Sequence, residues 1–416
     1  MDMTDVPNLA GLRALDRADS LGGFRDRFAL PTGVIYLDGN SLGALPAATN
    51  ARMADVIGRE WGNDLIKSWN INGWYEAPLR IGDKIGRLIG AAAGQVAAAD
   101  STSINIYKAL DAALQLRPDR AVVLSEPGNF PNDLYIVQGI AAQHGRNIEM
   151  RLRDAADIVE AIDESVAVVM LTHVHYRTAN RHDMAAITRR AHEKGALVIW
   201  DLCHSAGAIE IDLDGVNVDF AIGCGYKYLN GGPGCPAYIY VAKRHQDRVV
   251  SPLSGWLSHA RPFDFVDDYR PADGIARFLC GAHPVPGLMA LEVGVDLMIE
   301  AEMARVETKA HRMCDLFVQL VETRCAGHGL TLVTPRDAAD RGSHISFAHP
   351  DGYAMIQALI ERGVIGDYRA PSVLRFGFTP LYLSYEDVWN AVTILADILD
   401  SGSWREERFR TMAAVT

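Results

Sequence analysis

The chain has 416 residues, enough for one large buried core and a second, smaller one. Its 52 acidic and 40 basic side chains give a formal net charge of -12. That balance disfavours nucleic acid as a partner, because no excess of Lys and Arg is available to displace counterions. No apolar run reaches the length of a membrane span, and the acidic N-terminal stretch MDMTDVPNLAG lacks the order of a signal peptide, so we expect a cytoplasmic protein.

Short apolar runs in the first part of the chain predict buried strands, because they are apolar on both faces. They cover residues 121–124, 166–171, 196–201, 220–223 and 237–241. Residues 184–194 have helical periodicity, with Asp183 suited to the N-cap and Gly195 to the C′ position. This strand–helix–strand order is typical of an α/β domain with a mainly parallel sheet.

The pattern changes after residue 286. One long helix is expected over residues 288–326, followed by strands at 331–334 and 344–347, a helix at 353–361, a strand at 373–378 and a final helix at 385–399. The mixture predicts a smaller α+β domain. We therefore expect a large domain over residues 41–290, a small one over 291–416, and an N-terminal segment, 1–40, that packs with the small domain.

The cysteines and histidines do not predict a metal site. No CxxC pair occurs, so we expect free thiols rather than structural zinc. His173 and His175 follow a strand end without further ligands at defined spacing, which favours structural histidines. The cysteines are Cys203, Cys224, Cys235, Cys280, Cys314 and Cys325.

A lysine and an aspartate at two neighbouring strand ends carry the most information. Asp201 ends one apolar strand, and Lys227 follows the next, between two tyrosines. Strand ends of this kind face the ligand crevice of a parallel sheet. An amine among apolar groups has a lowered pKa and can form an imine with an aldehyde, while a carboxylate can keep a pyridinium nitrogen protonated. The competing interpretation is a surface lysine and a strand-end cap.

Three further positions are ambiguous by themselves. Hydroxyls at Ser101–Ser103, before a helical stretch, suit a phosphate or a simple N-cap. Phe130 lies in a loop after a strand, where it could stack on a flat ring or only form a turn. Arg375, within an apolar strand, needs an anion, which is either a substrate carboxylate or an internal Asp or Glu.

These residues lie in motifs that resemble those of the kynureninase family. Its members are enzymes of the aminotransferase-like fold type I that depend on pyridoxal phosphate. The likeness runs over nearly the whole chain, and YKYLN and DGNSLG are specific to kynureninase-like proteins. The motifs are YLDGNSLG (36–43), WGNDLIKSWN (61–70), STSIN (101–105), NFPND (129–133), LTHVHY (171–176), WDLCHSAGA (200–208), YKYLNGGPG (226–234), PLSGW (252–256) and RFGFTPLY (375–382).

The resemblance implies pyridoxal phosphate (PLP) on Lys227, which also moves the α-proton, with Phe130 stacked on the ring and Asp201 at its nitrogen. Tyr226 is expected to move protons at the γ-oxygen and Cβ. Further cofactor contacts are expected from Thr102, Ser103, Pro131, Asn132, Asp133, Thr172, Tyr226, His204, Trp256 and Ala282. Substrate contacts are expected from Asn40, Trp69 and Arg375.

The implied reaction is hydrolysis of the Cβ–Cγ bond of L-kynurenine to anthranilate and L-alanine, in tryptophan catabolism and NAD biosynthesis. 3-Hydroxykynurenine, which would give 3-hydroxyanthranilate, fits the same motifs. We expect a homodimer with active sites at the interface, where Trp256 comes from the partner subunit. Partners other than the small-molecule substrate, such as a membrane or nucleic acid, are not expected.

One position departs from the family, which usually has Thr or Asn where this chain has Ala282. The change removes a hydrogen bond of about 1 kcal/mol and bears on substrate preference, with His283 as the candidate replacement. Two alternatives stay open. A cysteine desulfurase or selenocysteine lyase would need a nucleophilic cysteine over the site, for which Cys325 is the candidate. A non-catalytic protein would bind PLP without turnover.

Overall fold

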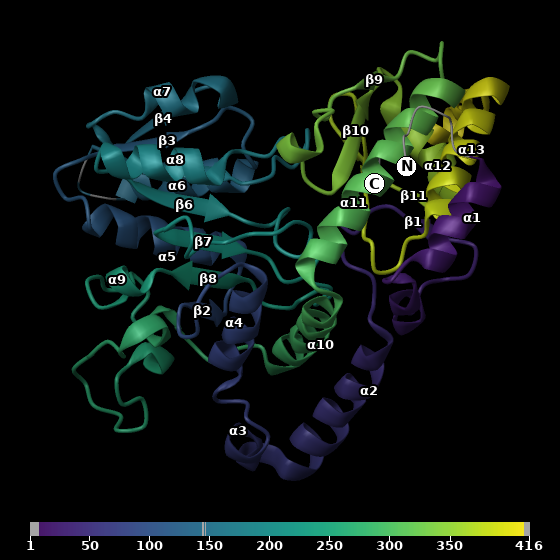
Figure 1. Cartoon of the computed structure of the whole chain (residues 1–416). Coiled ribbons are helices and arrows are strands. Elements are labelled where there is room, and N and C mark those ends of the chain that lie inside the picture. The colour runs from purple at the N-terminus through teal and green to yellow at the C-terminus, as the bar shows by residue number, and fades with distance from the viewer. Residues whose placement is uncertain (1–7, 144, 146, 412–416) are drawn as a thin grey trace.

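The computed structural model describes residues 8–143, 145 and 147–411, so the first seven residues of the acidic N-terminal stretch lie outside it. Its largest sheet has seven strands in the order β2-β8-β7-β6-β5-β3-β4 (Figure 1). Every pair from β4 to β7 is parallel, and β8 is antiparallel to both its neighbours. The strands are β2 (Val96–Ala98), β3 (Val122–Ser125), β4 (Glu149–Leu152), β5 (Val166–Thr172), β6 (Leu197–Asp201), β7 (Phe220–Gly223) and β8 (Tyr238–Val241).

The mainly parallel sheet confirms the predicted fold class, and all five predicted strands are present. Strand β6 shows why they were recognisable: Leu197 and Ile199 belong to one buried apolar cluster, while Val198 and Trp200 belong to another on the opposite face. A strand buried on both faces has no polar alternation. Strands β2 and β4 were not predicted, because β2 has three residues and β4 is a partly exposed edge strand.

Helices pack against this sheet. They include α4 (Ala77–Leu88), α5 (Thr102–Gln115), α6 (Pro131–Gln143) and α8 (Met184–Glu193). The predicted caps of α8 are present: the Asp183 side chain accepts from the Ala186 N–H at 2.9 Å, and Gly195 has a φ of 75°. The shorter helices are α2 (Ala47–Asp55), α3 (Ser68–Ile71), α7 (Ile158–Ala161) and α9 (Lys243–Gln246).

The C-terminal part forms a four-stranded antiparallel sheet in the order β12-β13-β10-β9. Its elements are β9 (Thr331–Leu332), β10 (His344–Ala348), α12 (Gly352–Glu361), β12 (Asp367–Arg369), β13 (Val373–Gly377) and α13 (Tyr385–Ser401). The N-terminal helix α1 (Leu9–Ala18) lies against α13, and Arg13 forms an ion pair with Glu386 at 2.6 Å. Strand β1 (Ile35–Tyr36) pairs with β11 (Val364–Ile365).

The prediction of one long helix over residues 288–326 was wrong. The chain forms α10 (Val285–Ala301) and α11 (Met303–Arg324), separated by Glu302, whose φ is 63°. A single residue in the left-handed region redirects the chain, and apolar periodicity does not detect it. Helix α10 packs against α4, and α11 packs against α13.

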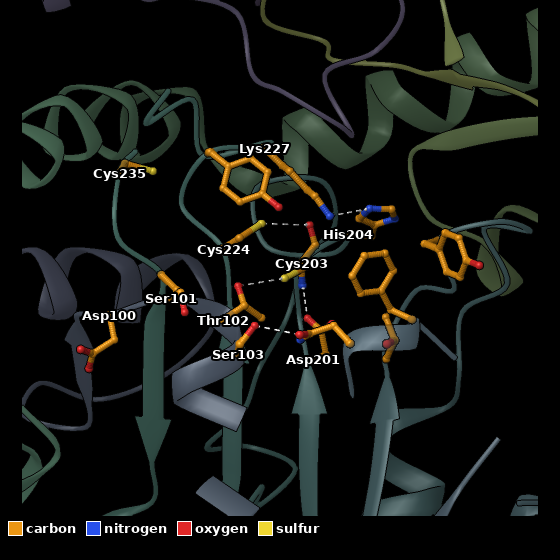
Figure 2. A pocket seen from close by; sticks show the side chains of 16 residues that line it. Asp100, Ser101, Thr102, Ser103, Asp201, Cys203, His204, Cys224, Lys227 and Cys235 are labelled. Carbon is orange, nitrogen blue, oxygen red and sulfur yellow. Dashed lines mark hydrogen bonds between the residues drawn. The ribbon is translucent and has the colours of Figure 1, made fainter. Parts of the chain in front are cut away.

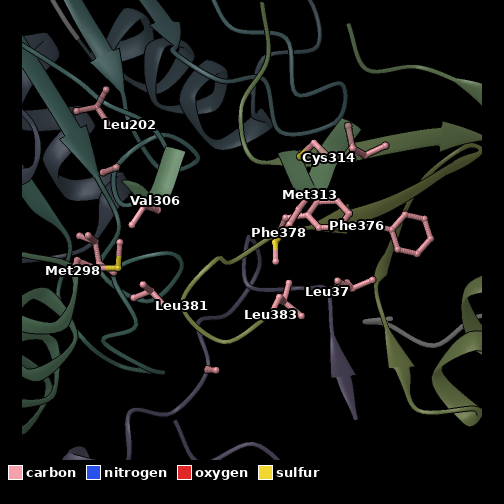
Figure 3. Close-up of a cluster of buried hydrophobic side chains, with 14 of the residues drawn as sticks. Leu37, Leu202, Met298, Val306, Met313, Cys314, Phe376, Phe378, Leu381 and Leu383 are labelled. Carbon is pink, nitrogen blue, oxygen red and sulfur yellow. The ribbon is translucent and has the colours of Figure 1, made fainter. Parts of the chain in front are cut away.

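A shared apolar core joins the two parts of the chain (Figure 3). Met298 of α10 and Leu202, next to β6, belong to the same buried cluster as Val306 of α11 and Phe376 of β13. The site described below is therefore framed by elements that are packed together. Within the described residues, no helix combines the length and apolar character needed to cross a bilayer.

Candidate active site

A pocket of about 300 Å³ opens at the carboxyl ends of the central strands (Figure 2). Thr172 ends β5, Asp201 ends β6, Lys227 follows β7, and Phe130 lies in the loop after β3. Parallel strands bring their carboxyl ends to one edge, which is why residues far apart in sequence meet here. The lining residues are Asp100, Ser101, Thr102, Ser103, Phe130, Asn132, Thr172, Tyr176, Asp201, Cys203, His204, Cys224, Tyr226, Lys227, Cys235 and Ala237.

The Lys227 amine points into this pocket, with Nζ 2.9 Å from Nε2 of His204. The rings of Phe130 and Tyr226 each have their centroid 5.8 Å from Nζ. Burial, then the nearby positive charges of Lys227 and Arg375, lowers the pKa of His204 well below its usual range. The imidazole is therefore neutral, and its Nε2 can accept a hydrogen bond from the amine.

Two buried carboxylates lie next to each other here: Asp201 lines the pocket, and Asp133 interacts with Asp201. The Asp201 Oδ1 accepts from the Cys203 N–H at 2.7 Å, and the hydroxyl of Thr172 donates to Asp133 Oδ2 at 3.4 Å. Burial raises the pKa of both aspartates, and the charge of Asp201 raises that of Asp133 further. Among the described residues, Asp133 Oδ1 is buried without a hydrogen-bond partner. A carboxylate pair of this kind is stabilised by an added cation such as a protonated ring nitrogen.

Hydroxyl groups gather at the start of α5. Ser101 caps this 14-residue helix, and Thr102 and Ser103 line the pocket. Ser103 Oγ donates to Asn132 Oδ1 at 2.8 Å. The amino end of a helix attracts a phosphate. Hydroxyls at one end of the pocket, the carboxylate pair, an aromatic ring and a reachable amine are together the groups that PLP requires, so the residues fit this cofactor.

Arg375 lies beside the pocket rather than on its lining and has an internal anionic partner. Its Nε and Nη2 donate to the two carboxylate oxygens of Asp367 at 2.8 and 2.5 Å. Its Nη1 donates to the Tyr176 carbonyl at 2.6 Å, and Nη2 also donates to Ser41 Oγ at 2.7 Å. Asn40 is fully buried against the guanidinium, and its amide oxygen, in the orientation that satisfies both groups, accepts from Nε at 2.9 Å.

Besides Arg375 and Asn40, five expected site residues are not part of the pocket lining: Pro131, Asp133, Trp69, Trp256 and Ala282. Trp69 packs against His283, with ring centroids 5.2 Å apart, and His283 Nε2 is 2.6 Å from the Trp74 carbonyl. Ala282 is exposed beside it. Trp256 is 43% exposed and packs edge-to-face on Phe263. Their expected contacts with cofactor or substrate stay predictions.

His173, His175 and Cys325 pack within the protein and are not part of the pocket lining. Burial lowers the pKa of His173 to about 3, and its ring packs on Trp200. His175 Nε2 is 2.8 Å from the Gly128 carbonyl. Cys325 is buried at the end of α11, away from the pocket lining. In the described part of the chain, no group of three or more His, Cys, Asp or Glu is placed to hold a metal ion.

The sequence reasoning did not assign roles to several residues that the structure brings here. Cys203 and Cys224 line the pocket just beyond the ends of β6 and β7. The same strand-end rule that found Asp201 could have found them. Asp367, the partner of Arg375, gave no such signal, because its role depends on strand pairing in the C-terminal sheet.

Two kinds of comparison place the chain among known proteins. Residues 306–395 match the family model "Kynureninase C-terminal domain". Proteins named kynureninase from Burkholderia pseudomallei (strain K96243) and Pseudomonas fluorescens are 54% and 53% identical to it, each over 97% of this chain and 98% of the relative. The match therefore spans nearly the full length of both chains.

Solved structures share the fold at much lower identity. An apo cysteine desulfurase from Thermococcus onnurineus NA1 has a TM-score of 0.77 at 17% identity and covers 91% of this chain and 98% of its own. A C-DES variant with glycine covalently linked to its PLP cofactor also has a TM-score of 0.77 at 17% identity, covering 90% and 99%. These likenesses confirm the fold type I architecture, and the identities above decide the family: the chain belongs to the kynureninases.

Proposed function

We propose that this protein is a PLP-dependent hydrolase that cleaves the Cβ–Cγ bond of L-kynurenine, giving anthranilate and L-alanine. One observation carries the proposal. A lysine amine, hydrogen-bonded to a neutral histidine, faces a buried carboxylate pair in a chain 54% identical to proteins named kynureninase. The same pocket would accept 3-hydroxykynurenine, which differs by one ring hydroxyl.

PLP, when bound, supplies an aldehyde and an electron-withdrawing pyridine ring, the chemistry that lets bonds near an amino acid's α-carbon break heterolytically. Lys227 would hold this group and afterwards move the proton of the substrate α-carbon. His204 fixes the position of the amine through the 2.9 Å contact. Asp201, supported by Asp133, would keep the ring nitrogen protonated, and Phe130 would cover one face of the ring.

Tyr226 is the proposed proton donor at the γ-oxygen and at Cβ. Its phenol lines the pocket beside Lys227. Burial, followed by negative charge at Cys224, raises the pKa of Tyr226 above its usual value. A phenol in this state keeps its proton at neutral pH, so it can donate the proton to a developing anion rather than act as a resting base.

Arg375 is the proposed anchor of the substrate carboxylate, with Asn40 and Trp69 near the rest of the substrate. Asp367, Ser41 and the Tyr176 carbonyl hold the guanidinium rigid, which leaves one N–H of Nη1 in a fixed direction. A substrate carboxylate would therefore meet a positioned cation rather than a mobile one. We propose that this positioning decides which substrate bonds align with the cofactor ring.

Anthranilate fluorescence after mixing purified protein, PLP and L-kynurenine tests the proposal. Steady production of anthranilate with an equal amount of alanine is the expected result. Sulfide release from cysteine without anthranilate would instead favour the desulfurase alternative, although burial raises the pKa of its candidate nucleophile, Cys325, to about 11. Bound PLP without either product would favour the non-catalytic alternative.

We propose that the protein is a homodimer with active sites at its interface. Two exposed apolar groups support this: Ile57, Trp61, Leu65, Ile66 and Ile71 on the segment 56–71, and Trp256, Phe263, Phe265 and Val266. Clusters of exposed large apolar side chains are typical of protein interfaces. Light scattering of the holoenzyme should give twice the chain mass, and Ile66→Lys combined with Phe265→Asp should shift it to that of one chain.

We also propose a three-part organisation: the segment 1–40, a large PLP-binding domain over 41–290 and a small domain over 291–416. Helix α10 spans the proposed boundary at residue 290 and packs on α4, and the backbone turns at Glu302 before α11. The cytoplasm is the proposed compartment. All six cysteines are free, as is usual where thiols are kept reduced.

A further inference from the structure

Two cysteines that the proposed reaction does not use lie next to each other in the pocket wall. Cys203 follows β6 and Cys224 follows β7, and both line the pocket (Figure 2). Cys224 Sγ is 3.9 Å from the Cys203 carbonyl oxygen, and the two thiols also form a side-chain hydrogen bond. Cys203 Sγ is 4.0 Å from Thr102 Oγ1, at the end of the pocket where the hydroxyls gather.

Strand register explains why these thiols meet. Asp201 and Ile222 are register partners on the parallel strands β6 and β7, and each cysteine lies two residues beyond its strand's partner. The Leu202 N–H still donates to the Ile222 carbonyl at 2.8 Å, so the two chains stay paired between these positions. Neighbouring strands lie about 4.8 Å apart, within the roughly 4.4–6.8 Å between Cα atoms that a disulfide requires.

The surroundings favour reaction at one of the two sulfurs. Burial works to raise the pKa of Cys224, but the hydrogen bond from Cys203 and the charge of Lys227 outweigh it and lower the pKa. That hydrogen bond and burial raise the pKa of Cys203. Cys224 is thus the more easily ionised thiol and the nucleophile of the pair, and Cys203 the partner that donates to it.

We propose that Cys203 and Cys224 form a reversible disulfide when the protein meets a peroxide, and that this bond disables the pocket. The Cys224 thiolate attacks one oxygen of hydrogen peroxide, which gives a sulfenic acid and hydroxide. The Cys203 sulfur then attacks the sulfenic sulfur, forming the S–S bond and releasing water. Two thiols and one peroxide become one disulfide and two waters, and a dithiol reductant reverses the change.

The effect on the pocket follows from what Cys203 contacts. Its backbone N–H donates to Asp201, and its neighbour His204 contacts Lys227. A bond that draws Cys203 towards Cys224 therefore shifts both the hydrogen bond to Asp201 and the contact between His204 and Lys227. The cross-link is measured by the capping of cysteine thiols and not by enzyme turnover. It can therefore be found or excluded even if the proposed reaction is wrong.

The test uses the holoenzyme, treated with graded hydrogen peroxide and then capped with iodoacetamide. No Lys or Arg lies between Lys194 and Lys227, so trypsin leaves both cysteines on one peptide, residues 195–227, once denaturation has released the cofactor. Mass spectrometry should find this peptide uncapped and two hydrogens lighter. A protease that cuts before Asp212, Asp214 or Asp219 should give two pieces joined only by the disulfide.

Cys235→Ser is the matched control, because Cys235 lines the same pocket and should leave the cross-link intact. Cys203→Ser and Cys224→Ser should each abolish it. The absorbance of bound PLP should change as the cross-link forms and return with dithiothreitol. Full capping of both cysteines after peroxide treatment, or a cross-link to Cys235 instead, overturns the proposal. A cross-link that leaves the absorbance unchanged overturns its effect on the pocket.

Discussion

The guanidinium of Arg375 binds both carboxylate oxygens of Asp367, at 2.8 Å from Nε and 2.5 Å from Nη2. The two residues are register partners on the antiparallel strands β13 and β12. Both side chains are buried, so either charge without the other would destabilise the folded protein. The pair therefore fixes a buried cation beside the pocket, where we propose that it anchors the substrate carboxylate.

Arg375→Lys should weaken substrate binding while leaving the cofactor in place. A lysine cannot form the two-oxygen contact, and loss of a charged hydrogen bond costs about 2 kcal/mol, or roughly 30-fold in KM. Steady-state kinetics with L-kynurenine measures this change, and the absorbance of bound PLP serves as the control. Asp367→Asn should shift KM in the same direction, and wild-type KM values in both variants would contradict the assignment.

Lys227→Ala should remove both the absorbance band of lysine-bound PLP and nearly all turnover. The substitution deletes the only atom in the described pocket lining that can hold the aldehyde as an imine and move the α-proton. We expect kcat to fall about 10³-fold or more. Lys243→Ala, an exposed lysine on α9, is the control and should behave as wild type. A Lys227→Ala protein that keeps band and turnover would end the assignment.

Tyr226→Phe should lower kcat about 100-fold and retain bound PLP, because a general acid contributes about that factor while the ring still fills its place. Stopped-flow spectroscopy and anthranilate release together locate the slowed step, which we expect after α-proton removal. The exposed Tyr135→Phe is the control. Unchanged kcat in Tyr226→Phe would show that another group donates the proton.

Asp38 should make stability depend on pH in the neutral range. Burial, followed by the charge of Asp367, raises the pKa of Asp38 to about 7, whereas an unfolded aspartate ionises near pH 4. Between these values the folded protein holds a proton that the unfolded chain has lost. Ionisation of this residue therefore favours unfolding as the pH rises from about 4 to about 7, and the loss remains at higher pH.

Asp38→Asn removes this dependence, because an amide stays neutral at every pH. We expect the variant's Tm to exceed that of wild type by more at about pH 8.5 than at about pH 5. Thermal melting of both proteins across this range gives the result, with the exposed Asp154→Asn as the control. An equal Tm difference at the two pH values would mean that Asp38 is ionised throughout.

Local signals explain why much of the fold was predictable. Residues 166–171, predicted as a strand, lie within β5, and the caps predicted at Asp183 and Gly195 are present on α8. Each signal depends only on neighbours in sequence: burial on both faces, a side chain that accepts a backbone N–H, or a glycine with positive φ. The break at Glu302 was missed because nothing in its periodicity marks it.

The sequence by itself predicted that Asp201 ends one apolar strand and that Lys227 follows another, and hence that both lie at one edge of a parallel sheet. Only the tertiary structure decided that Asp367 faces Arg375 and that Cys203 faces Cys224. Those pairings depend on the register between strands, which is set by packing of the whole sheet rather than by the order of residues within either strand.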